Sequence, residues 1–293
     1  MEEKFKETLY ITDLDGTLLG EDGVLSAYSR DTINQLVEQG VLFSVATART
    51  LHSAWDVVGE LNLQLPVVLM NGVLIYDLQK EQYLQVNHLP QEQVDLVIDL
   101  LQKLNMGGFM YALDGNTVKV YYNSTSERDQ RNPGFYKERT EWGGRVFIPQ
   151  EDFREAARDQ RIIYFTLYGD LEAMHVIYDE IRKMPELGHT FCEDIYDGRY
   201  FLEIFNPAIS KAAGADFIKK WCAAKEVVAF GDNQNDLEML EWADRSYVPE
   251  NGIRIAKRKA TQVLGPCGED CVARFIEQET GALSGRPDSN KAL

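Results

Sequence analysis

Two aspartates, Asp13 and Asp15, stand directly after an apolar run of the kind that forms a buried strand. The run covers residues 9–12, and Gly16 and Thr17 follow the acids. Carboxylates at the end of a buried strand are costly unless a cation or a reaction uses them. Phosphoryl transfer would use both, because one carboxylate can attack phosphorus while the other moves a proton to and from the reacting oxygens.

Three later residues could complete such a site: Thr47, Lys211 and Asp232. Asp232 would add negative charge to Asp13 and Asp15, and a hard divalent cation with oxygen ligands, Mg²⁺ by preference, would relieve that crowding. The Thr47 hydroxyl and the Lys211 ammonium would neutralise the phosphoryl oxygens on which transition-state charge collects. In this interpretation Asp13, Asp15, Thr47 and Lys211 are the catalytic residues.

Each of these residues also has an ordinary interpretation. An aspartate after a strand is commonly a turn residue, a threonine before a helix is commonly a cap, and a lysine is commonly solvated. Four features, the Asp13/Asp15 pair, Thr47, Lys211 and Asp232, nevertheless all fall at strand ends or helix starts. In a parallel sheet these positions meet along one edge. That shared placement favours a single site.

The elements that would hold these residues alternate between strand and helix. Apolar runs at 9–12, 41–46, 65–70 and 227–230 are separated by segments with helical periodicity, one of which Ser29 could cap. Strands that are apolar throughout are typical of a parallel sheet covered on both faces. The predicted fold class is therefore α/β, with a doubly wound, mainly parallel sheet as its core.

Residues 84–200 have a different character, with alternating hairpin signals around Asp114-Gly115 and Asp197-Gly198 and amphipathic helices between them. They predict an inserted α+β cap domain, with the catalytic core formed by residues 1–83 and 201–293. Residues 123–144 show little periodic structure. Six side chains of the insertion are candidates to meet a substrate's leaving group, although most such residues are simply solvated: Tyr111, Lys119, Arg128, Arg131, Arg139 and Arg199.

Composition narrows the classes of function. The chain has 293 residues and a formal net charge of −17, which argues against a nucleic-acid partner. No apolar stretch approaches the roughly 18 residues of a membrane span, and the N-terminus does not resemble a signal peptide. The four cysteines include no zinc-binding set and fit a reduced compartment, so the expected location, without a signal peptide, is the cytoplasm. The sequence leaves open whether the chain is a monomer or a homodimer.

The same residues resemble the motifs of the haloacid dehalogenase-like superfamily. Asp13-Leu14-Asp15-Gly16-Thr17 looks like motif I, Val45-Ala46-Thr47-Ala48-Arg49 like motif II, Ile209-Ser210-Lys211 like motif III, and Gly231-Asp232-Asn233-Gln234-Asn235-Asp236 like motif IV. The insertion between motifs II and III is similar to the C2 cap of the Cof-type phosphatases. The segment Met70-Asn71-Gly72 also resembles a segment of these phosphatases.

The resemblance implies a role for each matching residue. Asp13 would be nucleophile and metal ligand, Asp15 would be the acid–base group and bind metal through its backbone carbonyl, and Asp232 would be the third ligand. Asp236 would support these ligands without binding the metal directly. The substrate phosphate would be bound by Leu14, Thr47, Ala48, Lys211 and Asn235.

Two departures from the family pattern stand close to these motifs. Ala48 occupies a position where this subclass usually has glycine, and residues 249–252, Pro-Glu-Asn-Gly, replace a Gly-Asn-Ala loop. The second change leaves substrate fit and efficiency open.

The leading hypothesis is a Mg²⁺-dependent phosphatase that acts on a small phosphorylated metabolite, such as a sugar phosphate or a phosphorylated cofactor, through an aspartyl phosphate. One alternative is a phosphomutase, which would return the phosphoryl group to the substrate. Another is a binding protein that holds a phosphorylated effector without turnover.

Overall fold

The computed structural model describes residues 4–122, 146–193 and 198–281. These residues form two compact units, one of residues 1–81 with 211–293 and one of residues 82–210. The insertion was expected over 84–200. Its observed unit extends further because the strand Tyr200–Phe205 pairs with other strands of the insertion.

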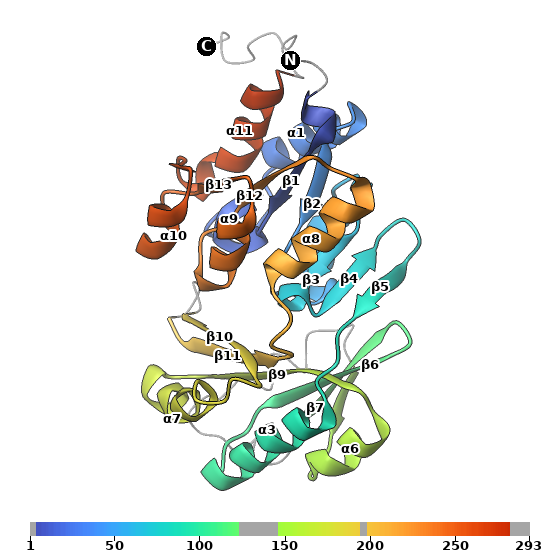
Figure 1. The fold of residues 1–293 in the computed structure, drawn as a ribbon, viewed down its shortest axis with the longest axis vertical. Helices are drawn as coiled ribbons and strands as arrows, with labels where there is room; N and C mark the ends of the chain where they lie inside the picture. Colours follow the sequence, from blue (N-terminus) through green and yellow to red (C-terminus); the bar gives the residue numbers. More distant parts are fainter. Residues whose placement is uncertain (1–3, 123–145, 194–197, 282–293) are drawn as a thin grey trace. The chain divides into compact units, whose positions relative to one another are not determined.

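The first unit is built on a five-stranded sheet with the order β14-β13-β12-β1-β2, in which every pairing is parallel. An isolated parallel bridge from Ala46 to Val68 continues this order toward β3. Figure 1 labels most elements of this unit. They are β1 (Thr8–Thr12), α1 (Ala27–Glu38), β2 (Leu42–Val45), α2 (Leu51–Val58), β3 (Val67–Leu69), β4 (Leu74–Asp77), α8 (Lys211–Cys222), β12 (Glu226–Phe230), α9 (Leu237–Trp242), β13 (Arg245–Val248), α10 (Arg254–Lys259), β14 (Gln262–Val263) and α11 (Cys271–Thr280).

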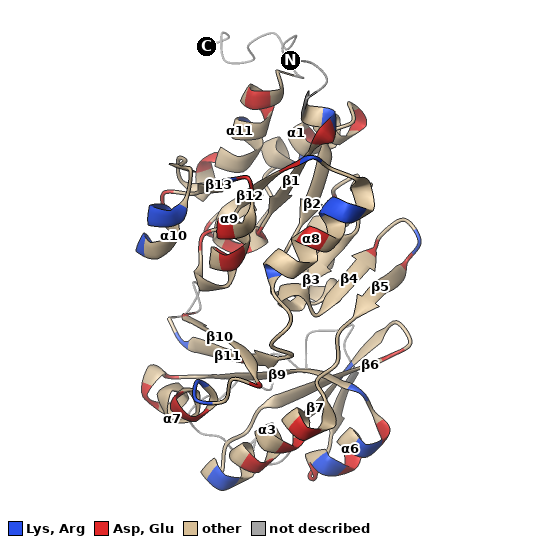
Figure 2. Ribbon diagram, in the orientation of Figure 1, with Lys and Arg blue, Asp and Glu red and all other residues tan. Residues whose placement is uncertain are grey.

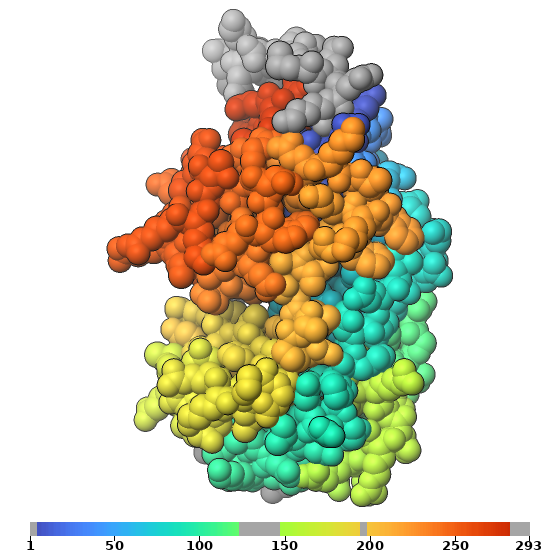
Figure 3. Space-filling view, viewed as in Figure 1, coloured from blue at the N-terminus to red at the C-terminus, as the bar shows by residue number. Residues whose placement is uncertain are grey.

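Helices cover both faces of this sheet. Leu9 and Ile11 of β1 pack in one cluster with residues of α8 and α9. On the opposite face Phe275 of α11 packs against the rings of Phe230 and Tyr247. In the space-filling view α8 to α11 and their loops, orange to red, form most of the visible face of this unit (Figure 3). The predicted α/β class with a doubly wound, mainly parallel sheet is confirmed.

The first helix begins earlier than the sequence suggested. Ser26, not Ser29, is the N-cap of α1, and its hydroxyl accepts a hydrogen bond from the Ser29 N–H (2.9 Å). The Ser29 hydroxyl instead donates to Asp270, just before α11 (2.9 Å). Two serines three residues apart are equally good caps locally, and the Ser26 hydroxyl donates to Asp270 as well. The hydrogen bond from the Ser29 N–H to the Ser26 hydroxyl is therefore what identifies Ser26 as the cap.

The second unit is a six-stranded sheet with the order β10-β11-β9-β6-β7-β8, antiparallel except for the β7–β8 pair. Its elements are β5 (Gln82–Val86), α3 (Gln91–Leu104), β6 (Phe109–Asp114), β7 (Thr117–Tyr122), β8 (Val146–Pro149), α6 (Phe153–Asp159), β9 (Ile162–Gly169), α7 (Leu171–Ile181), β10 (Gly188–Glu193) and β11 (Tyr200–Phe205). Its α+β content is that expected of the insertion.

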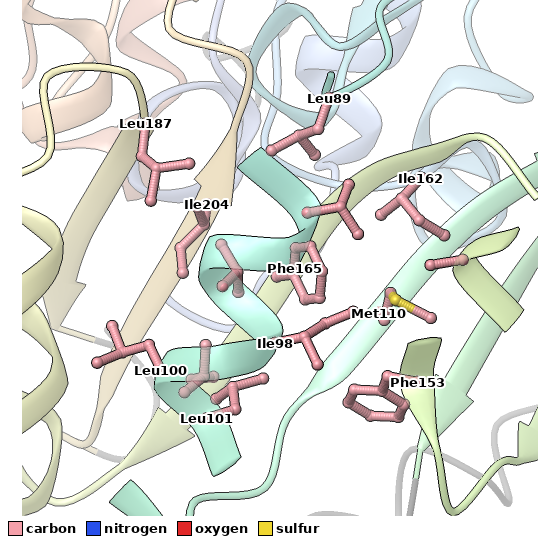
Figure 4. Close-up of a cluster of buried hydrophobic side chains, with 14 of the residues drawn as sticks. Leu89, Ile98, Leu100, Leu101, Met110, Phe153, Ile162, Phe165, Leu187 and Ile204 are labelled. Carbon is pink, nitrogen blue, oxygen red and sulfur yellow. The ribbon is translucent and has the colours of Figure 1, made fainter. Parts of the chain in front are cut away.

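This unit has a hydrophobic core of its own, which Figure 4 shows. Ile98 and Leu101 of α3, Phe153 of α6 and Ile177 of α7 pack in one cluster with Phe165 of β9. The i, i+3 spacing within α3 places its apolar side chains on a single face, which is why this helix lies on the sheet.

Charged residues gather on the helices, with a basic stretch on α10 (Figure 2). None of the helices within the described ranges combines the length and apolar character that crossing a bilayer requires.

Candidate active site

The predicted site lies where the strand order of the first sheet reverses. From β1 the chain goes to β2 on one side, and it later returns to β12 on the other. Asp13 follows β1, and its N–H donates to the carbonyl of Phe230, the last residue of β12 (2.9 Å). Asp232 comes two residues after β12. Ligands of open parallel sheets bind beyond the carboxyl ends of the strands at such a reversal.

Lys211, the first residue of α8, joins two of the site's carboxylates. Its Nζ lies 2.8 Å from Asp13 Oδ1 and 2.7 Å from Asp236 Oδ1, and its side chain is 0% exposed. Lys211 is therefore not a solvated surface lysine, which was the ordinary interpretation of this residue. A fully buried ammonium is stable only in such a paired arrangement.

Asp236 uses its other oxygen to shape the loop after β12. Oδ2 accepts hydrogen bonds from the backbone N–H groups of Asp232 and Asn233, both at 3.0 Å. Both oxygens of Asp236 are thus engaged by protein donors, one by Lys211 and one by the loop. Asp232 in turn accepts a hydrogen bond from the Thr17 hydroxyl at 3.1 Å.

Gly16 allows the turn after β1 to approach Asp232 closely. Its φ is +73°, and a Cβ at this position would lie 2.6 Å from Asp232 Oδ2. Any side chain here would combine a left-handed backbone with a displaced carboxylate. Position 16 thus requires glycine because the Asp232 carboxylate leaves no room for a Cβ.

Asp15 stands apart from this cluster and pairs with Arg49. The Arg49 Nε donates to Asp15 Oδ2 (2.8 Å), and Nη2 donates to Oδ1, while Nη1 donates to the Ser53 carbonyl (3.1 Å). Two parallel hydrogen bonds fix the plane of a carboxylate better than one. Sequence reasoning gave Arg49 no function, and its place two residues after Thr47 was the available signal.

The remaining predicted phosphate-binding residues lie on the loops around this cluster. Thr47 is buried, and its Oγ1 accepts a hydrogen bond from the Arg49 N–H (3.1 Å). Leu14 is buried within the turn after Asp13, and Ala48 is half-buried. Asn235 donates from Nδ2 to Asn71 Oδ1 (3.0 Å). Asn71 was noted in the sequence only for the resemblance of Met70-Asn71-Gly72 and was given no role in the site, although an Asn-Gly pair after an apolar strand is a strong turn signal.

The unusual loop at residues 249–252 is tied into the site by Asn251. Its Nδ2 donates to the Gly16 carbonyl (2.7 Å), and its Oδ1 accepts from the Cys267 N–H (3.0 Å). The Ile253 N–H donates to the Asp232 carbonyl (2.9 Å). The loop therefore supports the turns that carry the first and fourth motifs, and Asn251 is, after Arg49 and Asn71, a third residue to which the sequence gave no role in the site.

Three candidates of the second unit, Arg128, Arg131 and Arg139, lie outside the described residues. The other three contact residues of their own unit. Tyr111 is buried with its ring edge-on to Tyr164, Lys119 pairs with Asp114 (2.6 Å), and the Arg199 guanidinium lies 4.7 Å from the Tyr168 ring centre.

The electrostatics of the cluster indicate too much negative charge for one ammonium. Burial raises the pKa of Asp13 to about 7 although Lys211 acts in the opposite direction. Burial, and then the carboxylate of Asp236, raises the pKa of Asp232 to about 8. Burial alone would lower the pKa of Lys211, but Asp13 and Asp236 outweigh it and hold that pKa above its usual value.

These residues fit a hard divalent cation. Asp13, Asp232 and Asp236 each place a carboxylate oxygen within 4.8 Å of the other two. Because Lys211 and the loop N–H groups engage both oxygens of Asp236, Asp13 and Asp232 are the two that could bind the cation directly. Carboxylates are ligands that Mg²⁺ prefers, and a cation would favour the ionised forms that burial disfavours.

The raised pKa values predict a pH-dependent stability. In metal-free protein Asp13 keeps its proton up to about pH 7 and Asp232 up to about pH 8, whereas the unfolded chain loses both near pH 4. The free energy of unfolding therefore falls as pH rises through this window, by up to about 1.4 kcal/mol per pH unit for each retained proton. Mg²⁺ should offset this loss, and its stabilising effect should grow over the same window. Urea unfolding at pH 5.5, 7 and 8.5, with Mg²⁺ or with a chelator, measures both slopes.

The variant Asp232→Asn is the control, because it removes one of the two shifted acids. It should flatten the metal-free pH dependence and weaken the Mg²⁺ effect. An equal Mg²⁺ effect at all three pH values would contradict the prediction.

Known proteins resemble this chain over almost its whole length. A family model described as haloacid dehalogenase-like hydrolase matches residues 10–276. The 5-amino-6-(5-phospho-D-ribitylamino)uracil phosphatase YitU of Bacillus subtilis (strain 168) is 25% identical over 286 residues, covering 93% of this chain and 97% of that protein. The pyridoxal phosphate phosphatase YbhA of Escherichia coli (strain K12) is 26% identical over 278 residues, covering 90% and 95%.

A solved structure shares the fold. The crystal structure of a haloacid dehalogenase-like hydrolase from Bacteroides thetaiotaomicron matches with a TM-score of 0.73 at 22% identity, over 93% of this chain and 99% of that one.

Proposed function

Because the chain belongs to the haloacid dehalogenase-like hydrolases, as a phosphoric monoester hydrolase of the Cof type, we propose that it is a Mg²⁺-dependent phosphatase of small phosphorylated metabolites. The observation that carries this proposal is the buried cluster in which Lys211 joins Asp13 and Asp236 beside Asp232. Such a cluster combines a nucleophile, a fixed positive charge and oxygen ligands for a cation, which are the parts that phosphoryl transfer needs.

In the proposed mechanism an oxygen of Asp13 attacks the phosphorus of the substrate and forms an aspartyl phosphate. The leaving oxygen takes a proton from Asp15. Asp15 then accepts a proton from water as this water attacks the phosphorus, which releases inorganic phosphate and restores the Asp13 carboxylate. Arg49 occupies both oxygens of Asp15 in the structure, so Asp15 must exchange at least one of these hydrogen bonds to transfer a proton.

The other residues of the cluster hold charge in place during these steps. Lys211 fixes the Asp13 carboxylate and can neutralise a phosphoryl oxygen, and Thr47, the Leu14 and Ala48 backbone and Asn235 would bind the remaining oxygens. Asp13, Asp232 and the Asp15 carbonyl would hold Mg²⁺, which supplies Lewis-acid stabilisation of phosphate charge. Asp236, whose oxygens are engaged by Lys211 and by the loop N–H groups, would support these ligands.

We propose that residues 82–210 act as the cap domain that selects the substrate. The named relatives act on a phosphorylated ribitylaminouracil and on pyridoxal phosphate. A sugar phosphate or a phosphorylated cofactor is therefore the substrate class that we propose for this chain.

A screen of the purified full chain against sugar phosphates, pyridoxal phosphate and ribitylaminouracil phosphate tests this function. We expect release of inorganic phosphate that is lost with a chelator and restored by Mg²⁺. An isomerised substrate without free phosphate would instead indicate a phosphomutase. Binding of a phosphorylated compound without turnover in Mg²⁺ would contradict the proposal.

A further inference from the structure

The turn between β3 and β4 has an unusual backbone. Met70, Asn71 and Gly72 have φ values of +49°, +56° and +101°. Methionine rarely adopts the left-handed region, whereas asparagine does so more readily than most residues and glycine does so freely. All three residues are buried. Such strained backbone persists only where the surroundings hold it, and it is concentrated at functional sites.

The surroundings of this turn are the loops proposed to bind phosphate. The Met70 N–H donates to the Arg49 carbonyl (3.1 Å), and the Asn71 N–H donates to the Thr47 carbonyl (3.0 Å). The left-handed backbone thus presents two successive N–H groups to the loop after β2. Without them the carbonyls of Thr47 and Arg49 would have to find other donors.

The side chain of Asn71 contacts a second loop. Its Oδ1 accepts a hydrogen bond from Asn235 Nδ2 (3.0 Å), which lies on the loop after β12. The two residues are 164 positions apart in the chain. An amide group has two N–H donors and one oxygen, so fixing one N–H of Asn235 sets the plane in which its other donor and its oxygen lie.

We propose that Asn71 is a positioning residue for the phosphate site, in that its N–H places the Thr47 loop and its carbonyl oxygen orients the amide of Asn235. This inference rests on the proposed function, because it assumes that Thr47 and Asn235 bind the phosphoryl oxygens. Asparagine meets both requirements at once. Glycine would keep the backbone without the acceptor, and aspartate would bring another negative charge to a site for an anion.

The test compares Asn71→Gly, Asn235→Ala and the double variant, with Mg²⁺ present. Glycine accepts the left-handed backbone, so Asn71→Gly removes the side chain without adding strain. Inorganic phosphate is the probe, and its inhibition constant against a generic aryl phosphate is the readout. We expect each single variant to raise this constant about tenfold, as for one hydrogen bond to a charged group, and to raise KM more than it lowers kcat. In the double variant the inhibition constant should also rise about tenfold and not a hundredfold, because Asn71 acts through Asn235.

Asn105 provides a matched control. It has a φ of +48° and ends helix α3 in the other unit. Asn105→Gly makes the same chemical change in the same backbone region, and it should leave the inhibition constant for phosphate unchanged.

An unchanged inhibition constant in Asn71→Gly, or a hundredfold effect in the double variant, would overturn the inference while leaving the proposed function intact. Absence of hydrolysis in the unaltered protein would overturn the proposed function instead. Calorimetric titration with inorganic phosphate and Mg²⁺ would then test Asn71 by the same comparisons.

Discussion

Replacing Lys211 with methionine should lower the free energy of unfolding by about 3 to 5 kcal/mol at pH 8, the usual effect of removing one partner from a buried ion pair. The change leaves the carboxylates of Asp13 and Asp236 buried without their shared ammonium. Hydrolysis should be lost as well, since Asp13 loses the group that fixes it. Urea unfolding and an aryl phosphate assay measure the two effects.

Two further variants separate charge from side-chain volume. Lys220→Met changes an exposed lysine of the same helix, whose ion pair with Asp216 lies at the surface. This change should lower the free energy of unfolding by less than about 1 kcal/mol. Adding Asp236→Asn to Lys211→Met should recover part of the stability, because it removes one of the two stranded charges. A Lys211→Met protein as stable as the unaltered one at pH 8 would rule out this electrostatic account.

The second large effect is expected from Asp13→Asn. This variant should hydrolyse a generic aryl phosphate more slowly by a factor of roughly 10⁴ or more, which is the scale seen when a covalent nucleophile is removed. An amide cannot form the aspartyl phosphate. The fold should survive, because Lys211 keeps Asp236 as a partner and the amide no longer contributes a buried charge. Circular dichroism and unfolding curves check the fold, and phosphate release checks the reaction.

Asp77→Asn serves as the comparison. Asp77 is a buried aspartate in the same unit, at the end of β4, and it accepts hydrogen bonds from the Gln79 and Lys80 N–H groups (3.0 and 3.1 Å). It is not in the carboxylate cluster around Lys211, so this variant should retain activity. Full activity in Asp13→Asn would refute the proposed mechanism.

Much of the fold could be predicted because strands buried on both faces need apolar residues at every position. The runs that became β1, β2, β3 and β12 come close to this pattern, with the buried Ser44 of β2 as an exception, and they are typical of a parallel sheet covered by helices. Local signals were weaker at element ends. Ser26 and Ser29 are both suitable caps and both contact Asp270. Only the hydrogen bond from the Ser29 N–H to the Ser26 hydroxyl shows which one is the cap and which one lies inside the helix.

The candidate site was predictable in its residue types. Acids that follow apolar strands must lie at the carboxyl edge of the sheet, so Asp13 and Asp232 could be placed near one another from the order of the elements alone. Their separate roles remain predictions, supported by the geometry around Lys211 and tested by the variants above.

The sequence by itself thus determined the chemistry available here: carboxylates, a lysine and a threonine at strand ends and a helix start. Only the tertiary structure decided how these groups are held. It buried Lys211 completely, paired Asp15 with Arg49, and set Asn71 and Asn251 against the loops of the site. The physical reason is distance along the chain: the Asn251 contact with Gly16 spans 235 residues, and no local propensity specifies which loops of a folded sheet will meet.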